Sequence, residues 1–190
     1  MGALRIEIPD WLDALVPPEL GPGASDQDRI EWVLDVLDRQ VAEQTGGPFA
    51  AAVFSGTSGA VLGVGVNRVE PTATCVAHAE VLALSTATQA VGSFSLDGLE
   101  AVLVCSAEPC AMCLGAVVWA GVHRLVCAAT EADARAVGFD EGDKPDDWTE
   151  ALRHRGIEVV LGVGRARAAA SMRRYVELGG TVYNGDLHRP

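Results

Sequence analysis

A near-continuous apolar run at residues 99–106 is the feature that most restricts how this chain can fold. A strand with apolar side chains on both faces must be covered on both sides, so the run indicates a central strand with helices above and below it. Glu108-Pro109 follows, and then helix-forming residues up to about Ala120. Because proline is tolerated at a helix start but not inside a helix, we expect a helix from Cys110.

The other segments alternate between strand and helix patterns in the same way. Apolar residues at helical spacing after Asp26 predict a first helix, with Ser25 or Asp26 as its N-cap and Gly46-Gly47-Pro48 as its stop. Two runs rich in alanine and valine, 49–55 and 60–67, predict a β-hairpin. The pattern further predicts helices at 78–89 and 165–178 and strands at 124–129 and 157–162. This order indicates an α/β fold, a three-layer α/β/α sandwich around a mixed sheet of about five strands.

The chain of 190 residues has the length of one domain. We expect an N-terminal arm at 1–25, where four prolines and three glycines allow no more than a helical turn near Trp11. A single catalytic domain follows at 26–180, and its residues 130–156 are expected to form a helical turn and a long surface segment. Residues 181–190 are expected to form a tail that is a candidate lid over the active site.

Charge and hydropathy exclude two classes of partner. Against 14 basic residues there are 26 acidic ones, a net charge of −12, which repels a phosphate backbone, so no nucleic acid is expected as a partner. No segment approaches the roughly 18 apolar residues that span a bilayer, and the N-terminus has no basic and apolar leader pattern. We therefore expect no membrane partner and a cytoplasmic location.

The cysteine count favours thiols over disulfides. An odd number in a chain without a secretory signal argues against a disulfide framework, so the cysteines are expected to be reduced thiols or metal ligands. The five are Cys75, Cys105, Cys110, Cys113 and Cys127.

Two short motifs carry the chemistry. His78-Ala79-Glu80 begins one predicted helix, and Cys110 and Cys113 begin another. Thiolates are favoured at the positive end of a helix dipole, and two cysteines three positions apart in a first turn can bind one ion. With His78 they make three ligands for a single Zn²⁺ ion. The open fourth position is typical of a catalytic zinc rather than a structural one.

Glu80 is the candidate for the proton-transfer group that a metal site also needs. Zinc lowers the pKa of a bound water toward about 7, and Glu80, two residues from a ligand, can move the protons. Taken alone, a C-x-x-C motif would fit a redox pair or a structural zinc knuckle as well as it fits a catalytic zinc site. A knuckle needs a fourth ligand, but Cys105 and Cys127 fall in predicted strands, where buried thiols act as small apolar groups. We expect Cys75 to be a loop thiol.

At these residues the sequence resembles the cytidine deaminase superfamily, whose zinc deaminases carry H-x-E followed by P-C-x-x-C. Within it, the chain is similar to bacterial guanine deaminases over about residues 48–143. The matching segments are Gly47-Pro48-Phe49, Gly65-Val66-Asn67, His78-Ala79-Glu80, residues 108–116, Trp119-Ala120 and Gly138-Phe139-Asp140.

The resemblance implies that residues 26–180 are a zinc-dependent deaminase of a free aminated nucleobase, guanine first, with xanthine and ammonia as products. The alternatives are deamination of guanosine, cytidine, cytosine or an aminotriazine. A tRNA adenosine is less favoured, because an enzyme for that substrate needs a basic groove. A catalytically silent zinc scaffold is the alternative outside enzymes, but the presence of Glu80, which has no ligand role, argues against it.

The resemblance also implies roles for residues outside the two motifs. Asn67 would hydrogen-bond the base, and Phe49 and Trp119 would pack on its rings; Asn67 as a turn residue and the two aromatics as core residues are the alternatives. An acid of residues 131–141 would assist catalysis, Glu141 first and Asp140 second, unless these acids are solvated surface. The implied substrate-binding set is Asn67, Phe49, Ala79, Trp119, Asp140 and Tyr183.

A homodimer is the expected assembly. The resemblance implies it, and the helix at 110–120 carries more apolar residues than one core face needs, namely Leu114, Val117, Val118 and Trp119.

Overall fold

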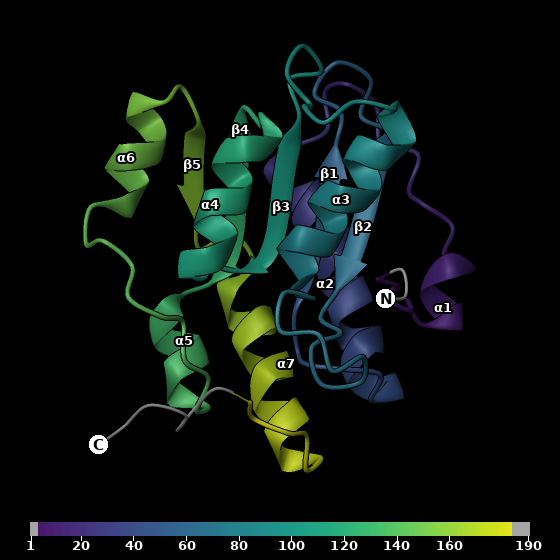
Figure 1. The fold of residues 1–190 in the computed structure, drawn as a ribbon, viewed down its shortest axis with the longest axis vertical. Helices are drawn as coiled ribbons and strands as arrows, with labels where there is room; N and C mark the ends of the chain where they lie inside the picture. Colours follow the sequence, from purple (N-terminus) through teal and green to yellow (C-terminus); the bar gives the residue numbers. More distant parts are fainter. Residues whose placement is uncertain (1–3, 184–190) are drawn as a thin grey trace.

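The computed structural model describes residues 4–183 and contains a five-stranded mixed sheet between two layers of helices (Figure 1). The strand order is β2-β1-β3-β4-β5. The strands are β1 (Ala50–Phe54), β2 (Val61–Val66), β3 (Val102–Ala107), β4 (Arg124–Ala129) and β5 (Glu158–Leu161). β1 is antiparallel to β2 and β3, whereas β3, β4 and β5 are parallel. The predicted three-layer α/β fold is confirmed.

Helices cover both faces of the sheet, as the apolar run at its centre requires. On one face lie α2 (Asp26–Glu43) and α7 (Arg165–Glu177), and on the other α3 (Ala79–Val91), α4 (Ala111–Ala120) and α6 (Trp148–His154). The short α5 (Glu131–Ala136) contacts α7. All six residues of β3 are buried, which agrees with its position between β1 and β4.

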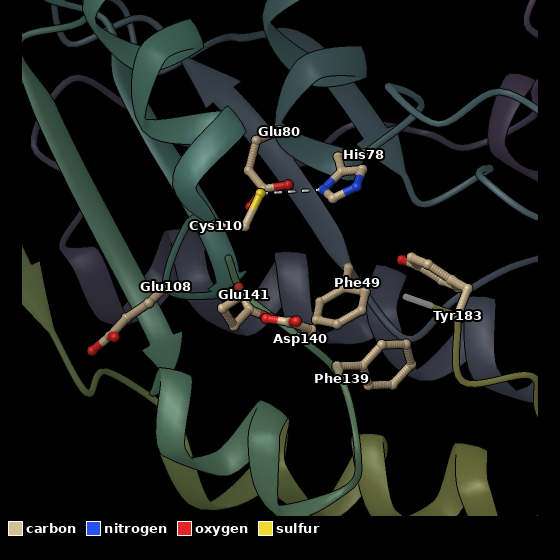
Figure 2. Close-up of a pocket in the computed structure, with 9 residues that line it drawn as sticks. All are labelled: Phe49, His78, Glu80, Glu108, Cys110, Phe139, Asp140, Glu141 and Tyr183. Carbon is tan, nitrogen blue, oxygen red and sulfur yellow. Dashed lines mark hydrogen bonds between the residues drawn. The ribbon is translucent and has the colours of Figure 1, made fainter. Parts of the chain in front are cut away.

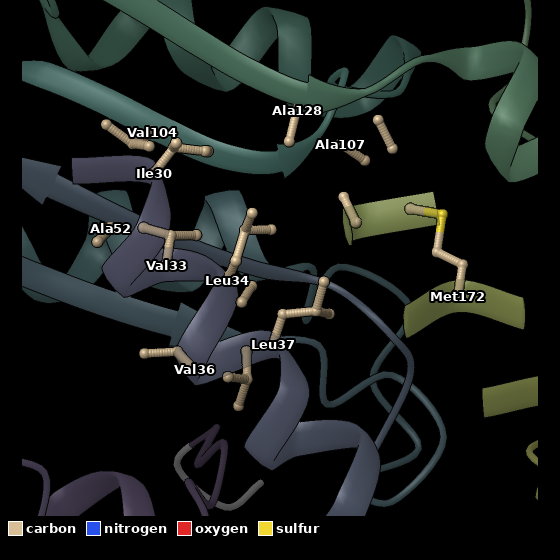
Figure 3. Close-up of a cluster of buried hydrophobic side chains, with 14 of the residues drawn as sticks. Ile30, Val33, Leu34, Val36, Leu37, Ala52, Val104, Ala107, Ala128 and Met172 are labelled. Carbon is tan, nitrogen blue, oxygen red and sulfur yellow. The ribbon is translucent and has the colours of Figure 1, made fainter. Parts of the chain in front are cut away.

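The core on the α2 side is built from aliphatic side chains of that helix (Figure 3). Ile30, Leu34 and Leu37 recur at helical spacing and are fully buried against β1, β3 and α7. Ser25 caps α2, because its hydroxyl accepts from the amide of Asp28 and the Asp28 carboxylate accepts from the amide of Ser25. This helix is therefore held both by its cap and by its apolar face.

A glycine of β2 sets how closely α3 approaches the sheet. A Cβ at Gly65 would lie 2.3 Å from the carbonyl oxygen of Ala79 and 2.5 Å from the amide nitrogen of Ala83. These neighbours are backbone atoms that cannot turn aside, so only glycine allows this contact. The first turn of α3, which follows His78, is thereby pressed against the strand.

Some elements differ from the prediction in their bounds or their presence. His78 and Cys110 are the N-caps of α3 and α4 and have extended backbones, so the helices begin one residue later than expected. β3 begins at Val102, because Glu100 adopts a positive φ of 48° in the turn before it. Within the segment expected to be surface, α6 forms because Trp148 and Leu152 are buried on the sheet.

The N-terminal arm packs on the rest of the chain. It contains the short α1 (Asp10–Asp13), whose Leu12 is buried in the core. The indole of Trp11 donates a hydrogen bond to the hydroxyl of Thr45, 3.1 Å away. The predicted tail is described as far as Tyr183; the remainder, 184–190, lies outside the described residues.

No helix in residues 4–183 is both long enough and apolar enough to span a bilayer.

Candidate metal centre and substrate pocket

The three predicted metal ligands lie together where α3 and α4 begin. The Nδ1 atom of His78 is 3.5 Å from the sulfur of Cys110 and 3.6 Å from the sulfur of Cys113. All three donor atoms lie within 4.8 Å of one another. Two helix starts from different parts of the chain thus supply one compact donor set.

These distances fit a zinc ion. With Zn–S near 2.3 Å and Zn–N near 2.0–2.1 Å, a tetrahedral site places a nitrogen and a sulfur ligand about 3.6 Å apart. Both nitrogen–sulfur distances agree with that value. Hydrogen bonding from Cys113, and then from His78, lowers the pKa of Cys110 to about 4, although burial opposes its ionisation. Cys110 is therefore prepared to act as a thiolate ligand.

Glu80 lies beside the donor set in the first turn of α3 (Figure 2). It is 7% exposed, and burial, followed by the charge of Cys110, raises the pKa of its carboxyl above the ordinary value. A raised pKa allows a carboxyl group both to take up and to release a proton near neutral pH. Glu80 is thus a buried carboxyl group with a raised pKa beside the donor set.

A small pocket opens onto this centre. Its wall is partly aromatic: the ring of Phe139 packs edge-on against Phe49, at 5.0 Å between centroids, and against Tyr183, at 5.4 Å. The lining residues are Phe49, His78, Glu80, Glu108, Cys110, Phe139, Asp140, Glu141 and Tyr183 (Figure 2). A flat, apolar ring system with polar edges suits such a wall.

Asn67 is joined to Tyr183, which belongs to the aromatic wall of the pocket. Asn67 is fully buried, and its side-chain amide donates a hydrogen bond to the Tyr183 hydroxyl. The carbonyl oxygen of the same side chain accepts from the amide of Val69, 3.2 Å away. Burial, followed by the nearby carboxyl groups, raises the pKa of Tyr183, so its hydroxyl stays neutral. The start of the tail therefore contacts the pocket.

Glu141 enters the pocket from the segment after α5. It is 5% exposed, and its carbonyl oxygen accepts from the amide of Ala111, the first residue of α4, at 3.0 Å. Burial, followed by the charges of Cys110 and Glu80, raises the pKa of its carboxyl to about 8. The carboxyl group is therefore neutral at pH 7 and able to donate.

Three predicted substrate contacts, Asn67, Trp119 and Ala79, do not line the pocket. Trp119 needs a correction: its side chain is 83% exposed on α4, because Val117 and Ala120 occupy the buried side of that helix and turn the indole outward. Ala79 is buried against β2 and also does not line the pocket. Asp140 does line it, although its carboxylate accepts from the amide of Gly142 at 2.9 Å.

Glu108 and Phe139 line the pocket but were absent from the predicted site residues. Both residues lie within the segments that carry the family resemblance, and this resemblance could have identified them as site residues. Glu108 precedes a metal ligand by two positions, and Phe139 precedes the two acids considered for catalysis.

Metal removal should destabilise the protein. A ligand bound at 1,000 times its dissociation constant stabilises the folded state by about 4 kcal/mol. For a chain of this size that corresponds to a fall in melting temperature of about 8–16 °C when a chelator removes the zinc. Metal analysis and differential scanning calorimetry measure the content and the shift.

The ligand set itself is tested with two cysteine variants. We expect Cys113→Ser to lose zinc and Cys75→Ser, which changes an exposed thiol, to keep one zinc per chain. X-ray absorption should show two sulfur ligands and one nitrogen ligand from the protein. A fourth protein ligand at the metal would contradict a catalytic site.

Comparison with known proteins agrees with this geometry. The family described as "Cytidine and deoxycytidylate deaminase zinc-binding region" matches residues 24–129, more than half of the chain. Guanine deaminase of Bacillus subtilis (strain 168) is 40% identical over 106 residues, which are 53% of this chain and 65% of that protein. The chain thus spans just under two thirds of the length of that relative.

Solved structures resemble the chain over nearly its whole length. The structure of a guanine deaminase from Nitrosomonas europaea is 44% identical, with a TM-score of 0.85, and covers 91% of this chain and 96% of its own. A protein in complex with 2,6-diaminopurine is also 44% identical, with a TM-score of 0.87 over 96% of this chain and 97% of its own. The shared zinc-binding region and the donor set around His78 fit a single zinc ion. This chain is a member of the cytidine and deoxycytidylate deaminase zinc-binding family.

Proposed function

We propose that this chain is a zinc-dependent aminohydrolase that converts guanine to xanthine and ammonia. The observation that carries the proposal is the pocket, in which the metal donors, Glu80 and Glu141 meet an aromatic wall. The pocket is small, which favours a free base over a nucleoside. The similarity to guanine deaminases and to a protein that binds 2,6-diaminopurine supports a purine.

The reaction replaces the exocyclic amine of the base with an oxygen from water. Bound zinc supplies a water of lowered pKa at neutral pH. Glu80 would take one proton from that water and pass it to the ring nitrogen beside the amine-bearing carbon, while the water oxygen bonds to that carbon. Glu80 would then take the second proton from the same oxygen and pass it to the amine. The carbon–nitrogen bond then breaks and ammonia leaves.

Glu141 has the second proton-transfer position in this proposal. Its neutral carboxyl group donates to the leaving amine or to the edge of the base, while Phe49 and Phe139 hold the plane of the ring. The low exposure of both carboxyl groups keeps competing water away.

We propose further that residues 26–180 form the deaminase domain and that the tail from 181 closes the pocket. The side-chain amide of Asn67, a group suited to recognise the edge of a base, donates its hydrogen bond to the Tyr183 hydroxyl. We expect Tyr183→Ala to raise the KM for guanine by about 2–12-fold, because one aromatic contact contributes roughly 0.5–1.5 kcal/mol in addition to its buried area. Steady-state kinetics measure it.

Phe94→Ala is the control, since that ring is 92% exposed and away from the pocket. A KM for guanine that is unchanged in Tyr183→Ala, or equally changed in both variants, would contradict a closing role for the tail.

We propose a homodimer as the assembly and the cytoplasm as the location. On α4, Trp119 and Met112 are 83% and 38% exposed, and such apolar exposure on one helix favours a protein interface. None of the five cysteines is in a disulfide, which suits a reducing compartment. Light scattering at micromolar concentration tests the dimer, and a monomer would refute it.

Ammonia release from a panel of substrates tests the proposed function. The zinc-loaded chain is incubated with guanine, guanosine, cytosine, cytidine, adenine and ammeline, and with a tRNA anticodon stem. We expect guanine to have the highest kcat/KM. Inactivity toward guanine, together with turnover of the anticodon stem or a nucleoside, would overturn the proposal.

A further inference from the structure

Lys144 is the only lysine among the 190 residues of the chain; the other 13 basic residues are arginines. Its side chain is 2% exposed, although the neighbouring residues of the segment after Glu141 are mostly on the surface. A buried ammonium group is costly unless charges of the opposite sign surround it. The position of this group therefore calls for a physical reason.

Two carboxylates next to the pocket face the ammonium group. The Nζ atom of Lys144 lies 3.0 Å from Oε2 of Glu131 and 3.6 Å from Oε2 of Glu108. Neither contact has the geometry of a hydrogen bond, so the attraction is mainly one of charge. The same nitrogen lies 5.0 Å from the centre of the Trp148 ring. Lys144 thus joins the turn before Cys110, the start of α5 and the start of α6.

The two carboxylates are themselves fixed. Oε2 of Glu108 accepts from the backbone amide of Glu131 at 3.1 Å, and Oε1 of Glu131 accepts from Nε of Arg135 at 2.7 Å. Arg135 also donates to the carbonyl oxygen of Gly142 at 3.2 Å. The charge of Lys144 therefore pulls the segment toward a rigid partner rather than toward a mobile surface group.

Glu141 lies among the attachment points of this segment, which include the contacts of Arg135 with Asp140 and with the Gly142 carbonyl oxygen. On one side its own carbonyl oxygen is held by the amide of Ala111, and three residues later Lys144 is held by Glu131 and Glu108. The carboxyl group of Glu141 enters the pocket from this stretch. The position of this carboxyl group therefore depends on these attachments together, and Lys144 is the one that is buried.

We propose that Lys144 is a positioning residue for deamination, which holds the segment 140–144, and with it the carboxyl of Glu141, against the pocket through Glu131 and Glu108. This inference rests on the proposed function, because the positioning of Glu141 matters for turnover only if Glu141 takes part in proton transfer. Lys144 itself does not line the pocket.

A double-mutant cycle separates positioning from a merely structural role. A displacement of about 1 Å at a reacting group can cost on the order of 10²-fold in rate. We therefore expect Lys144→Met to lower kcat for guanine by about 10–100-fold, with KM within about threefold and zinc retained. In a Glu141→Gln background the same change should lower kcat by less than about threefold, because glutamine at position 141 has no acidic proton to transfer.

Two further variants serve as controls for this experiment. Arg153→Met removes a cation from α6 that forms an ion pair with surface Glu150 and donates to the carbonyl oxygen of Val159, and it should leave kcat unchanged. Glu131→Gln removes the partner instead of the ammonium and should reproduce the loss in smaller measure, even if Lys144→Met folds poorly. Wild-type kcat in both Lys144→Met and Glu131→Gln, or an equal loss in both Glu141 backgrounds, would overturn the proposal.

Amide hydrogen exchange tests the positioning without any substrate. The amide of Gly142 is held by Asp140 within the segment, and we expect its exchange to accelerate at least tenfold in Lys144→Met but not in Arg153→Met. If the wild-type chain fails to deaminate guanine, the proposed function fails while this measurement still decides the role of Lys144. Unchanged exchange across residues 140–144 would overturn that role.

Discussion

Replacing Glu80 with glutamine is expected to lower guanine turnover by about 10²–10⁴-fold, the range that general acid–base groups usually contribute. Glutamine has nearly the same shape, so the buried site beside Cys110 stays filled, but it cannot accept and pass on a proton. Because Glu80 is not one of the three metal donors, zinc content should not change. Ammonia release and metal analysis on the same sample measure both results.

The matched control is Glu100→Gln, which makes the same chemical change in the turn before β3, away from the pocket. It should retain full turnover. Near-normal ammonia release from zinc-loaded Glu80→Gln would show that another group moves the proton. Loss of zinc from that variant would instead show that the carboxylate takes part in binding the metal.

Glu141 should show a smaller loss that depends on the replacement. Its carboxyl group, with a pKa raised to about 8 by burial, is a donor at pH 7. Glutamine keeps an N–H donor but transfers no proton, so we expect Glu141→Gln to lower kcat by about 10²-fold with little change in KM. Alanine removes the donor as well, so Glu141→Ala should also raise KM.

Steady-state kinetics on the two variants therefore distinguish the two parts of the role. The control is Asp143→Asn, an exposed acid of the same segment that does not line the pocket. Equal kinetic constants for Glu141→Gln and the wild type would remove Glu141 from the mechanism and would favour Asp140 as the assisting acid.

The fold was predictable where the apolar pattern is strong. The buried run before Pro109 marks a central strand, and the spacing of Ile30, Leu34 and Leu37 marks a long amphipathic helix. α6 was not predicted, because seven residues with only Trp148 and Leu152 buried give no clear periodicity. Its formation depends on the sheet that it covers.

The metal donors were predictable for a different reason. Their spacing lies within two short motifs, whereas the pocket wall depends on tertiary packing. Phe139 meets Tyr183 across 44 positions, and Lys144 meets Glu108 across 36, so no local pattern relates them. Trp119 shows that a motif match alone does not place a side chain in the pocket. It lies within a matching segment, yet its indole faces away from the chain's own pocket.

Guanine turnover in water labelled with heavy oxygen tests the central claim most directly. The zinc-loaded chain should convert guanine to xanthine that carries one labelled oxygen, with one equivalent of ammonia, and a chelator should stop the reaction until zinc is restored. Mass spectrometry of the product reports the label. Guanine that is recovered unchanged from the zinc-loaded chain, or xanthine formed at the same rate without zinc, would contradict zinc-dependent hydrolytic deamination of guanine.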